Sequence, residues 1–258
     1  MSSVPRFFVP PNAIHGETAV LPSEVAHHAV NVLRLRVGEA VVLHDGNENA
    51  YECHLREVSK NSATVTVVRA YRLNTEPRTR ITVAQALPKT TDKIEQVLQH
   101  GTEVGAAGFY FFTGFRSVAR LAKGEKIEKR LARWEAIVRG AAEQSRRGVL
   151  PPVEWLPFTQ DVAARIPQFD RAFALHESAE TSLPEALAPV TPEARLLVIV
   201  GPEGGFTDEE IALLTDHGAP PVSLGPRILR TETAALVALT QILLLTGLSA
   251  GGTIQQHS

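Results

Sequence analysis

The chain has 258 residues, and 44% of them are hydrophobic, which is enough apolar surface for one large or two modest domains. Its 26 basic and 28 acidic residues nearly balance, so the net charge alone indicates no partner. A single cysteine, Cys53, excludes an internal disulfide and favours a reducing compartment. No uninterrupted apolar segment approaches the roughly 18 residues of a membrane span, so we expect a soluble cytoplasmic protein with no membrane partner.

The first 72 residues are typical of a small β module. Apolar and polar residues alternate over 51–56 and 63–67, which predicts half-buried strands separated by polar turns. Ser23 is expected to cap a short helix in which Val25 and Ala29 recur at helical spacing. The pattern therefore predicts a barrel-like β domain interrupted by one helix.

The pattern changes after a polar, proline-containing stretch. Residues 73–80 lack periodicity, which makes them the predicted linker between a domain of residues 1–72 and a domain of residues 81–258. Beyond the linker, short apolar runs alternate with helix-like segments, as in βαβ units, and so predict a parallel sheet. The runs are 81–87, 109–112, 171–175, 196–200 and 221–224, with a further candidate strand at 152–155.

Three helices can be predicted individually. Residues 125–145 carry apolar side chains every three to four positions and leave a basic face for solvent, within a stretch rich in lysine and arginine. Thr207 and Glu210 have the spacing of a capping box, and Gly218 is expected to end that helix. Residues 233–246 are apolar nearly all round, so the domain or a second subunit should enclose them.

Two glycine- and proline-containing segments are the most informative features of the chain. Residues 201–206 (GPEGGF) follow the apolar run 196–200, and residues 224–233 (LGPRILRTET) follow the run 221–224. Each segment thus leaves the end of a predicted parallel strand, at the sheet edge where ligands bind. Irregular loops of this kind present backbone groups to a polar ligand, so we expect both to form one pocket.

Several common site motifs are absent from the sequence. It contains no phosphate loop of the G-x-x-x-x-G-K-[ST] type, no G-x-G-x-x-G after a strand, and no nucleophile elbow or paired-cysteine zinc motif. His27 and His28 are adjacent on a predicted helix and point about 100° apart, which makes a poor ligand pair. We expect no metal site.

The two segments resemble those of the SPOUT class of S-adenosylmethionine-dependent RNA methyltransferases. Within that class, residues 201–205 and 224–234 are most similar to the bacterial family that methylates N3 of a uridine in 16S ribosomal RNA. Shorter similarities lie at 5–6, 32–34, 143–147 and 175–176. The resemblance implies an α/β fold: a SPOUT-type parallel sheet with a C-terminal trefoil knot, preceded by a small PUA-like β-barrel domain. It also implies a homodimer whose partner is 16S ribosomal RNA or the small ribosomal subunit.

The resemblance also assigns roles to residues. The residues that it places against S-adenosylmethionine are His176, Gly201, Pro202, Glu203, Gly204, Gly205, Leu224, Gly225, Ile228, Leu229, Arg230 and Thr231. Arg230 is the candidate for stabilising the uracil anion, and Glu203 and Glu232 are alternative acceptors of the uracil proton. The candidates for RNA contact are Arg6, Arg34, Lys89, Arg146 and Arg147.

Two other functions are compatible with the same sequence. One is a SPOUT methyltransferase that acts on transfer RNA. The other is a non-catalytic RNA-binding factor of ribosome assembly that keeps the fold without the chemistry. Binding of S-adenosylmethionine would separate the enzymes from the non-catalytic factor.

Overall fold

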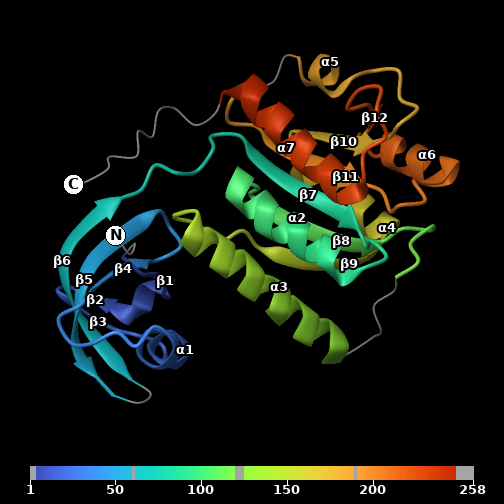
Figure 1. Ribbon diagram of the computed structural model, residues 1–258. Coiled ribbons are helices and arrows are strands. Elements are labelled where there is room, and N and C mark those ends of the chain that lie inside the picture. Colours follow the sequence, from blue (N-terminus) through green and yellow to red (C-terminus); the bar gives the residue numbers. More distant parts are fainter. Residues whose placement is uncertain (1–3, 60–61, 120–124, 189–190, 248–258) are drawn as a thin grey trace. The chain divides into compact units, whose positions relative to one another are not determined.

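The protein was analysed as a computed structural model, which describes residues 4–59, 62–119, 125–188 and 191–247 (Figure 1). The chain forms two compact units. The first contains Met1–Glu76 together with Ala142–Leu150, and the second contains Pro77–Ala141 and Pro151–Ser258. The division predicted from the sequence, 1–72, 73–80 and 81–258, stays a prediction, and the compact units add residues 142–150 to the N-terminal part.

The first unit is built on a curved, mainly antiparallel sheet. Within the described residues, its strands in spatial order are β1 (Arg6–Phe8), β4 (Ala40–His44), β5 (Asn49–Val58), β6 (Ala63–Arg72), β3 (Thr18–Val20) and β2 (Ile14–His15). Only the β1–β4 pair among these is parallel. Inward-facing side chains of β5 and β6, among them Cys53, Leu55, Ala63 and Val65, contribute to its core, as the period-two alternation predicted.

The helical part of the first unit differs in detail from the prediction. Helix α1 (Ser23–His27) continues into a π-helical turn, η2 (His28–Val32), and a 3-10 turn, η1 (Pro11–Ala13), precedes β2. The predicted capping role of Ser23 is wrong, because Pro22 occupies the cap position and no side-chain hydrogen bond caps the helix. Ser23 is instead the first helical residue, a position that needs no capping side chain.

The second unit contains a wholly parallel sheet, which confirms the βαβ prediction. Its described strands in spatial order are β12 (Pro221–Val222), β10 (Arg171–Leu175), β11 (Arg195–Val200), β7 (Arg80–Ala86), β8 (Gly108–Thr113) and β9 (Val153–Phe158). The strands that begin or end near the two glycine-containing segments, β11 and β12, flank β10. Their carboxyl ends therefore meet at one edge of the sheet.

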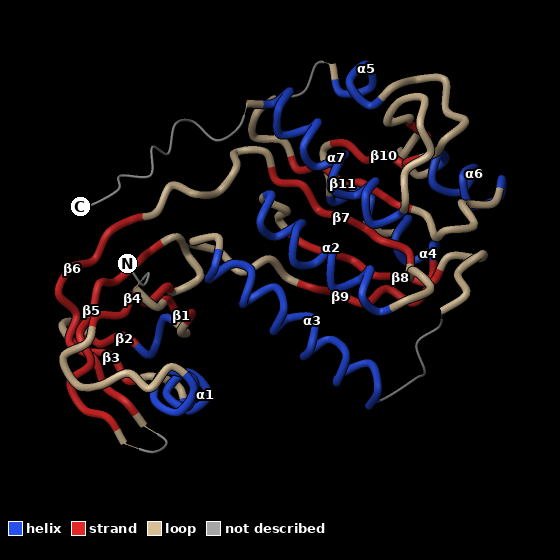
Figure 2. The backbone as a smooth tube through the Cα atoms, viewed as in Figure 1, coloured by secondary structure: helices blue, strands red, loops and turns tan. Residues whose placement is uncertain are grey.

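Helices cover both faces of this sheet (Figure 2). Along β11, Leu196 and Val198 face one core, and Leu197 and Ile199 face the other. The first core includes residues of α2 (Thr91–Val104), α3 (Glu125–Gln144), α5 (Leu183–Leu187) and α7 (Thr231–Thr246). The second includes residues of α4 (Thr159–Ala163), η3 (Ile166–Gln168) and α6 (Asp208–Asp216). This burial on both faces explains the continuous apolar runs.

The last two helices meet their sequence predictions closely. Helix α6 has the predicted capping box, in which the Glu210 amide donates to Thr207 Oγ1 at 3.2 Å, and Gly218 follows it at φ +97°. Helix α7 returns from β12 at the sheet edge and packs on α2, α5, β11 and β7. Leu244 and Leu245 near its end are 67% and 54% exposed, so the unit encloses only part of the helix. In the described part of the chain, no helix is both long and apolar enough to cross a membrane.

Candidate active site

A cavity of about 500 Å³ opens at the carboxyl ends of β10, β11 and β12. Such a volume is typical of a small-molecule site, which covers roughly 300–1,000 Å³. Every residue that the sequence assigned to the cofactor lines the cavity: His176, Gly201, Pro202, Glu203, Gly204, Gly205, Leu224, Gly225, Ile228, Leu229, Arg230 and Thr231. The sheet topology thus brings together two segments that are separated by α6 in the sequence.

Glycines give the two segments conformations that other residues rarely adopt. Gly205 has φ +70° and Gly225 has φ +117°, both in the left-handed region. A Cβ at either position would meet nothing within 4 Å, so the backbone dihedral, and not crowding within the chain, requires glycine. Both glycines leave open space in the cavity wall where a ligand could approach the backbone.

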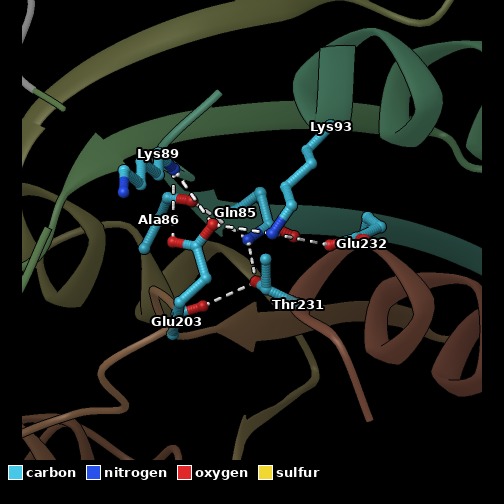
Figure 3. Close-up of polar contacts among 8 residues, drawn as sticks. Gln85, Ala86, Lys89, Lys93, Glu203, Thr231 and Glu232 are labelled. Carbon is cyan, nitrogen blue, oxygen red and sulfur yellow. Dashed lines mark hydrogen bonds and ion pairs between the residues drawn. The ribbon is translucent and has the colours of Figure 1, made fainter. Parts of the chain in front are cut away.

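A buried hydroxyl ties the two segments to each other and to the sheet. Thr231 Oγ1, at the start of α7, donates to the Gly201 carbonyl at 2.7 Å and accepts from Gln85 Nε2 at 2.6 Å. Gln85 lies in β7 and is fully buried. Figure 3 shows the side chains of Gln85 and Thr231 converging from β7 and α7. Thr231 therefore fixes the floor of the cavity and does more than begin a helix.

The carboxylate of Glu203 is fully engaged by the chain itself. It accepts hydrogen bonds from Lys93 Nζ at 2.8 Å and from the Lys89 amide at 3.0 and 3.2 Å (Figure 3). Burial raises the pKa of Glu203, but the hydrogen bonds from Lys93 and Lys89 outweigh it, so the pKa lies below its ordinary value. The hydrogen bond to Glu203 in turn raises the pKa of Lys93. This pair stays charged over the neutral pH range.

Glu232 lies in a different environment on the first turn of α7. It is 8% exposed, and its Oε2 lies 3.6 Å from Lys93 Nζ, an ion-pair distance that is too long for a hydrogen bond. Within the described residues, that oxygen has no hydrogen-bond partner. A carboxylate on the first turn of a helix is also stabilised by the helix dipole. Glu232 itself does not line the cavity, whereas the residues on either side of its turn, Thr231 and Ala234, do.

Arg230 and His176 lie at the rim of the cavity. Arg230 is exposed at the cap position of α7, and its guanidinium has no hydrogen-bond or ion-pair partner in the described part of the chain. A guanidinium in this position is available to an anionic ligand. His176 follows β10 and is held by its amide, which donates to the Val222 carbonyl at 3.0 Å.

The residues predicted to contact RNA are distributed over both units. Lys89 is exposed in the second unit, beside the cavity loop that it bonds. In the first unit, Arg34 and Arg146 are exposed, and Arg6 is half-buried near Arg146. Burial and the neighbouring Arg146 lower the pKa of Arg6, which indicates a local concentration of positive charge.

Arg147 is the exception among these basic residues. It is 4% exposed, and its guanidinium forms an ion pair with Glu76 at 2.5 Å inside the first unit. Its carbonyl accepts a hydrogen bond from His44 Nδ1 at 2.9 Å. A buried, paired guanidinium does not present its charge to a polyanion. The expectation of RNA contact is therefore corrected at this position, where Arg147 has a structural role.

Three residues that shape the site were not predicted from the sequence. Gln85 and Lys93 support the cavity from β7 and α2, and Arg116 donates to the carbonyls of Gly204 and Phe206 at 3.0 and 3.2 Å. Gln85 lies within the predicted strand 81–87, and Lys93 follows that strand on the next helix. Because ligands bind at the carboxyl ends of parallel strands, the same rule applied to the 81–87 run would have indicated this region.

The cavity fits S-adenosylmethionine in size and in chemistry. Leu224, Ile228 and Leu229 offer apolar surface to a purine, and the glycine-rich backbone offers polar groups. The fit depends on the open space at Gly205 and Gly225.

Comparison with known proteins gives the same result. Residues 75–243 match the RNA methyltransferase domain family, and residues 21–68 match the RNA methyltransferase PUA domain family. Ribosomal RNA small subunit methyltransferase E of Bacillus subtilis is 36% identical over 91% of this chain and 93% of its own length. The protein of that name from Mycobacterium tuberculosis is 39% identical over 90% of this chain and 88% of its own length.

Solved structures agree over nearly the whole chain. Ribosomal RNA small subunit methyltransferase E of Neisseria gonorrhoeae, bound to S-adenosylmethionine, has a TM-score of 0.83 at 30% identity, covering 94% of this chain and 98% of that one. A methyltransferase of Legionella pneumophila in complex with the same cofactor has a TM-score of 0.86 at 31% identity, with the same coverage.

Fold and site together define an RNA methyltransferase of the SPOUT class with a PUA-like N-terminal domain, as the sequence resemblance predicted. Its sheet and its two-loop cavity are the parts of that class that the described residues display. Within the class, the chain belongs to the ribosomal RNA small subunit methyltransferase E family.

Proposed function

We propose that this protein transfers the methyl group of S-adenosylmethionine to N3 of a uridine in 16S ribosomal RNA of the small ribosomal subunit. The observation that carries the proposal is the cavity, because all the residues assigned to the cofactor from the sequence line it. The names of the relatives support small-subunit ribosomal RNA as the substrate, and the S-adenosylmethionine bound in the Neisseria protein supports the cofactor.

Bound S-adenosylmethionine would supply an electrophilic methyl group on a sulfonium. The 201–206 loop and residues 224–231 would hold it, with the apolar side chains of the second segment against its purine. Aligning the reactants, and displacing water from the cavity when both are bound, would favour a transfer in which charge is lost. These two segments would thus bind and orient the cofactor.

Uracil N3 carries a proton that must leave before it can accept a methyl group. The guanidinium of Arg230, which has no partner among the residues that the structure describes, is our candidate for stabilising the uracil anion and easing the loss of the proton. Glu232 does not line the cavity but directly follows Thr231, which does, and we prefer it of the two candidate acceptors because its Oε2 has no hydrogen-bond partner among the described residues. Glu203 is weaker, since its lowered pKa and its bonds to Lys93 and Lys89 reduce its basicity.

Substitution separates these roles. Arg230→Ala should abolish methylation of unmethylated small subunits and leave the S-adenosylmethionine affinity, measured by calorimetry, within about twofold. Glu232→Gln should lower kcat far more than Glu203→Gln. Unchanged turnover in Arg230→Ala would remove that residue from the mechanism, and equal losses in the two glutamine variants would remove the preference for Glu232.

The target is tested in cells. Deleting the gene should remove 3-methyluridine from 16S ribosomal RNA, as measured by mass spectrometry of nuclease digests. Loss of a methylated nucleoside from transfer RNA instead would favour the transfer RNA alternative. Failure of the purified protein to bind S-adenosylmethionine would favour the non-catalytic factor.

We also propose that the protein acts in the cytoplasm as a homodimer that binds RNA through Arg6, Arg34, Lys89 and Arg146. The apolar end of α7, where Leu244 and Leu245 are exposed, supports a subunit contact. Leu244→Asp should shift the sedimentation coefficient towards that of the monomer, and an unchanged coefficient would argue against this contact. Because these basic side chains would contact phosphates, the RNA affinity should fall steeply with added salt.

A further inference from the structure

Two phenylalanines are unusually exposed in the second unit. Phe115 is 78% exposed and Phe158 is 58% exposed, and they are the two most exposed aromatic side chains in the described ranges. A phenylalanine left in water forgoes the stabilisation that burial would give. Exposed aromatics grouped together commonly mark a binding surface.

The two side chains belong to neighbouring strand ends. Phe158 ends β9, where it is the register partner of Thr113 at the end of β8. Phe115 follows Thr113 by two residues, so both aromatics lie at the carboxyl edge of the sheet that carries the cavity. We refer to Phe115 and Phe158 as the aromatic pair.

A buried carboxylate fixes the backbone beneath both members of the pair. Glu210 is 8% exposed, and its Oε1 accepts from the Phe115 amide at 3.0 Å and from Thr159 Oγ1 at 2.6 Å. Its Oε2 accepts from the Thr207 amide at 3.0 Å. The capping box of α6 needs only the contact with Thr207, so the other two bonds serve the chain segments that carry the aromatic pair. The pair is thus held by the structure although its rings are exposed.

The same region is joined to the cofactor cavity. Arg116, next to Phe115, donates from its guanidinium to the carbonyls of Gly204 and Phe206. Gly204 and Phe206 both line the cavity. The segment that carries Phe115 is therefore bonded directly to the loop that lines the candidate active site.

From these contacts we infer that the aromatic pair stacks on unpaired bases of the substrate RNA that flank the target nucleotide. The inference rests on the proposed function. An enzyme that acts on a base must receive it out of its stack, and proteins recognise unstacked RNA bases chiefly on aromatic side chains. An RNA partner is favoured over a protein because the pair lies at the sheet edge that carries the cavity and its segment is bonded to the cavity loop, where the target base must enter.

Neighbouring charges indicate which part of the RNA is contacted. Asp161 accepts a hydrogen bond from the Phe158 amide at 2.9 Å, and Glu209 lies close enough to Arg116 for their charges to interact. These carboxylates would repel phosphates, so the pair should contact bases and leave the backbone to the arginines elsewhere. Its contribution to binding should then be independent of salt.

The test uses the full-length protein with small ribosomal subunits and with protein-free 16S RNA, both from cells lacking the gene. Phe115→Ala and Phe158→Ala should each raise the KM for RNA about tenfold, the range expected for loss of one stacked base. The S-adenosylmethionine affinity and the slope of log affinity against log salt should stay unchanged. Phe115→Trp should keep the RNA affinity that Phe115→Ala loses, and RNA should quench the fluorescence of the introduced tryptophan.

Val118 provides the matched control, because it is 72% exposed in the same loop but cannot stack. Val118→Ala should leave the KM within about twofold of the unmodified protein. Unchanged KM values in both phenylalanine-to-alanine variants would overturn the inference. A smaller slope of log affinity against log salt in these variants would also overturn it, as would a weaker binding of whole subunits without a weaker binding of protein-free RNA. The last result would identify a ribosomal protein as the partner. If the unmodified protein fails to methylate either RNA, the proposed function fails first.

Discussion

Replacing Thr231 by valine tests whether its hydroxyl holds the cavity floor together. The change keeps the shape of the side chain and removes the bonds to Gly201 and Gln85. A neutral hydrogen bond contributes about 0.5–1.5 kcal/mol, and an unsatisfied buried partner costs about 1–3 kcal/mol. Gln85 is fully buried but keeps a bond to the Ala86 carbonyl at 3.0 Å, and solvent can reach Gly201 through the cavity. We therefore expect Thr231→Val to cost about 2 kcal/mol.

Thr231→Ser is the matched control, because it retains the hydroxyl and loses only a methyl group, worth about 0.8 kcal/mol. Urea unfolding followed by tryptophan fluorescence is suited to this comparison, since Trp134 and Trp155 both lie in the second unit. The valine variant should also bind S-adenosylmethionine more weakly than the serine variant. If the two variants have the same free energy of unfolding within about 0.5 kcal/mol, the hydroxyl does not hold the floor and the reasoning is refuted.

Three further predictions concern charge, backbone and thiol chemistry. Lys93→Met should cost about 1 kcal/mol at pH 7, since the pair is partly exposed to solvent. The pKa of Glu203 is lowered in the folded protein, so the stabilisation from its ionised carboxylate is present above pH 4.5 and is lost as the pH falls below that value. The free energy of unfolding should therefore fall less between pH 7 and pH 4 in Lys93→Met than in the unmodified protein. Gly225→Ala should lower the free energy of unfolding by about 1 kcal/mol or more, because its φ is +117°, and should weaken cofactor binding. Gly140→Ala is the control: it lies inside α3 with free space around it and should raise the free energy of unfolding by about 1 kcal/mol. Equal effects of the two substitutions on stability would contradict this reasoning. Burial raises the pKa of Cys53 to about 12, so iodoacetamide at pH 8 should label it only in urea, and rapid labelling of the folded protein, seen by mass spectrometry, would contradict its burial.

Local patterns were sufficient to predict the architecture of the second unit. The apolar runs at 171–175 and 196–200 became β10 and β11, because strands buried on both faces need continuous apolar sequence. The two glycine-containing segments were located at the correct sheet edge by the same reasoning. The predicted cofactor residues were brought together by the strand order, in which β10 lies between β11 and β12.

Contacts between residues far apart in the sequence could not be predicted in this way. The bond between Gln85 and Thr231 spans 146 positions, and that between Lys93 and Glu203 spans 110. Neither residue type nor spacing indicates such a pair until the sheet order is known. Arg147 shows the converse limit, because a basic residue after a basic helix is typical of surface, and only its buried partner, Glu76, gives it a structural role.

The division of the first unit into two stretches affects how it can be made and exchanged. Residues 142–150 complete it through the bonds from Glu48 to Gly148 and from His44 to Arg147. During synthesis this unit stays unfinished until β7, α2, β8 and α3 have been translated, so it cannot simply fold first as N-terminal domains usually do. A chimaera that grafts residues 1–76 onto a relative would lack these bonds, and a successful graft must carry both stretches and rejoin the chain at three junctions.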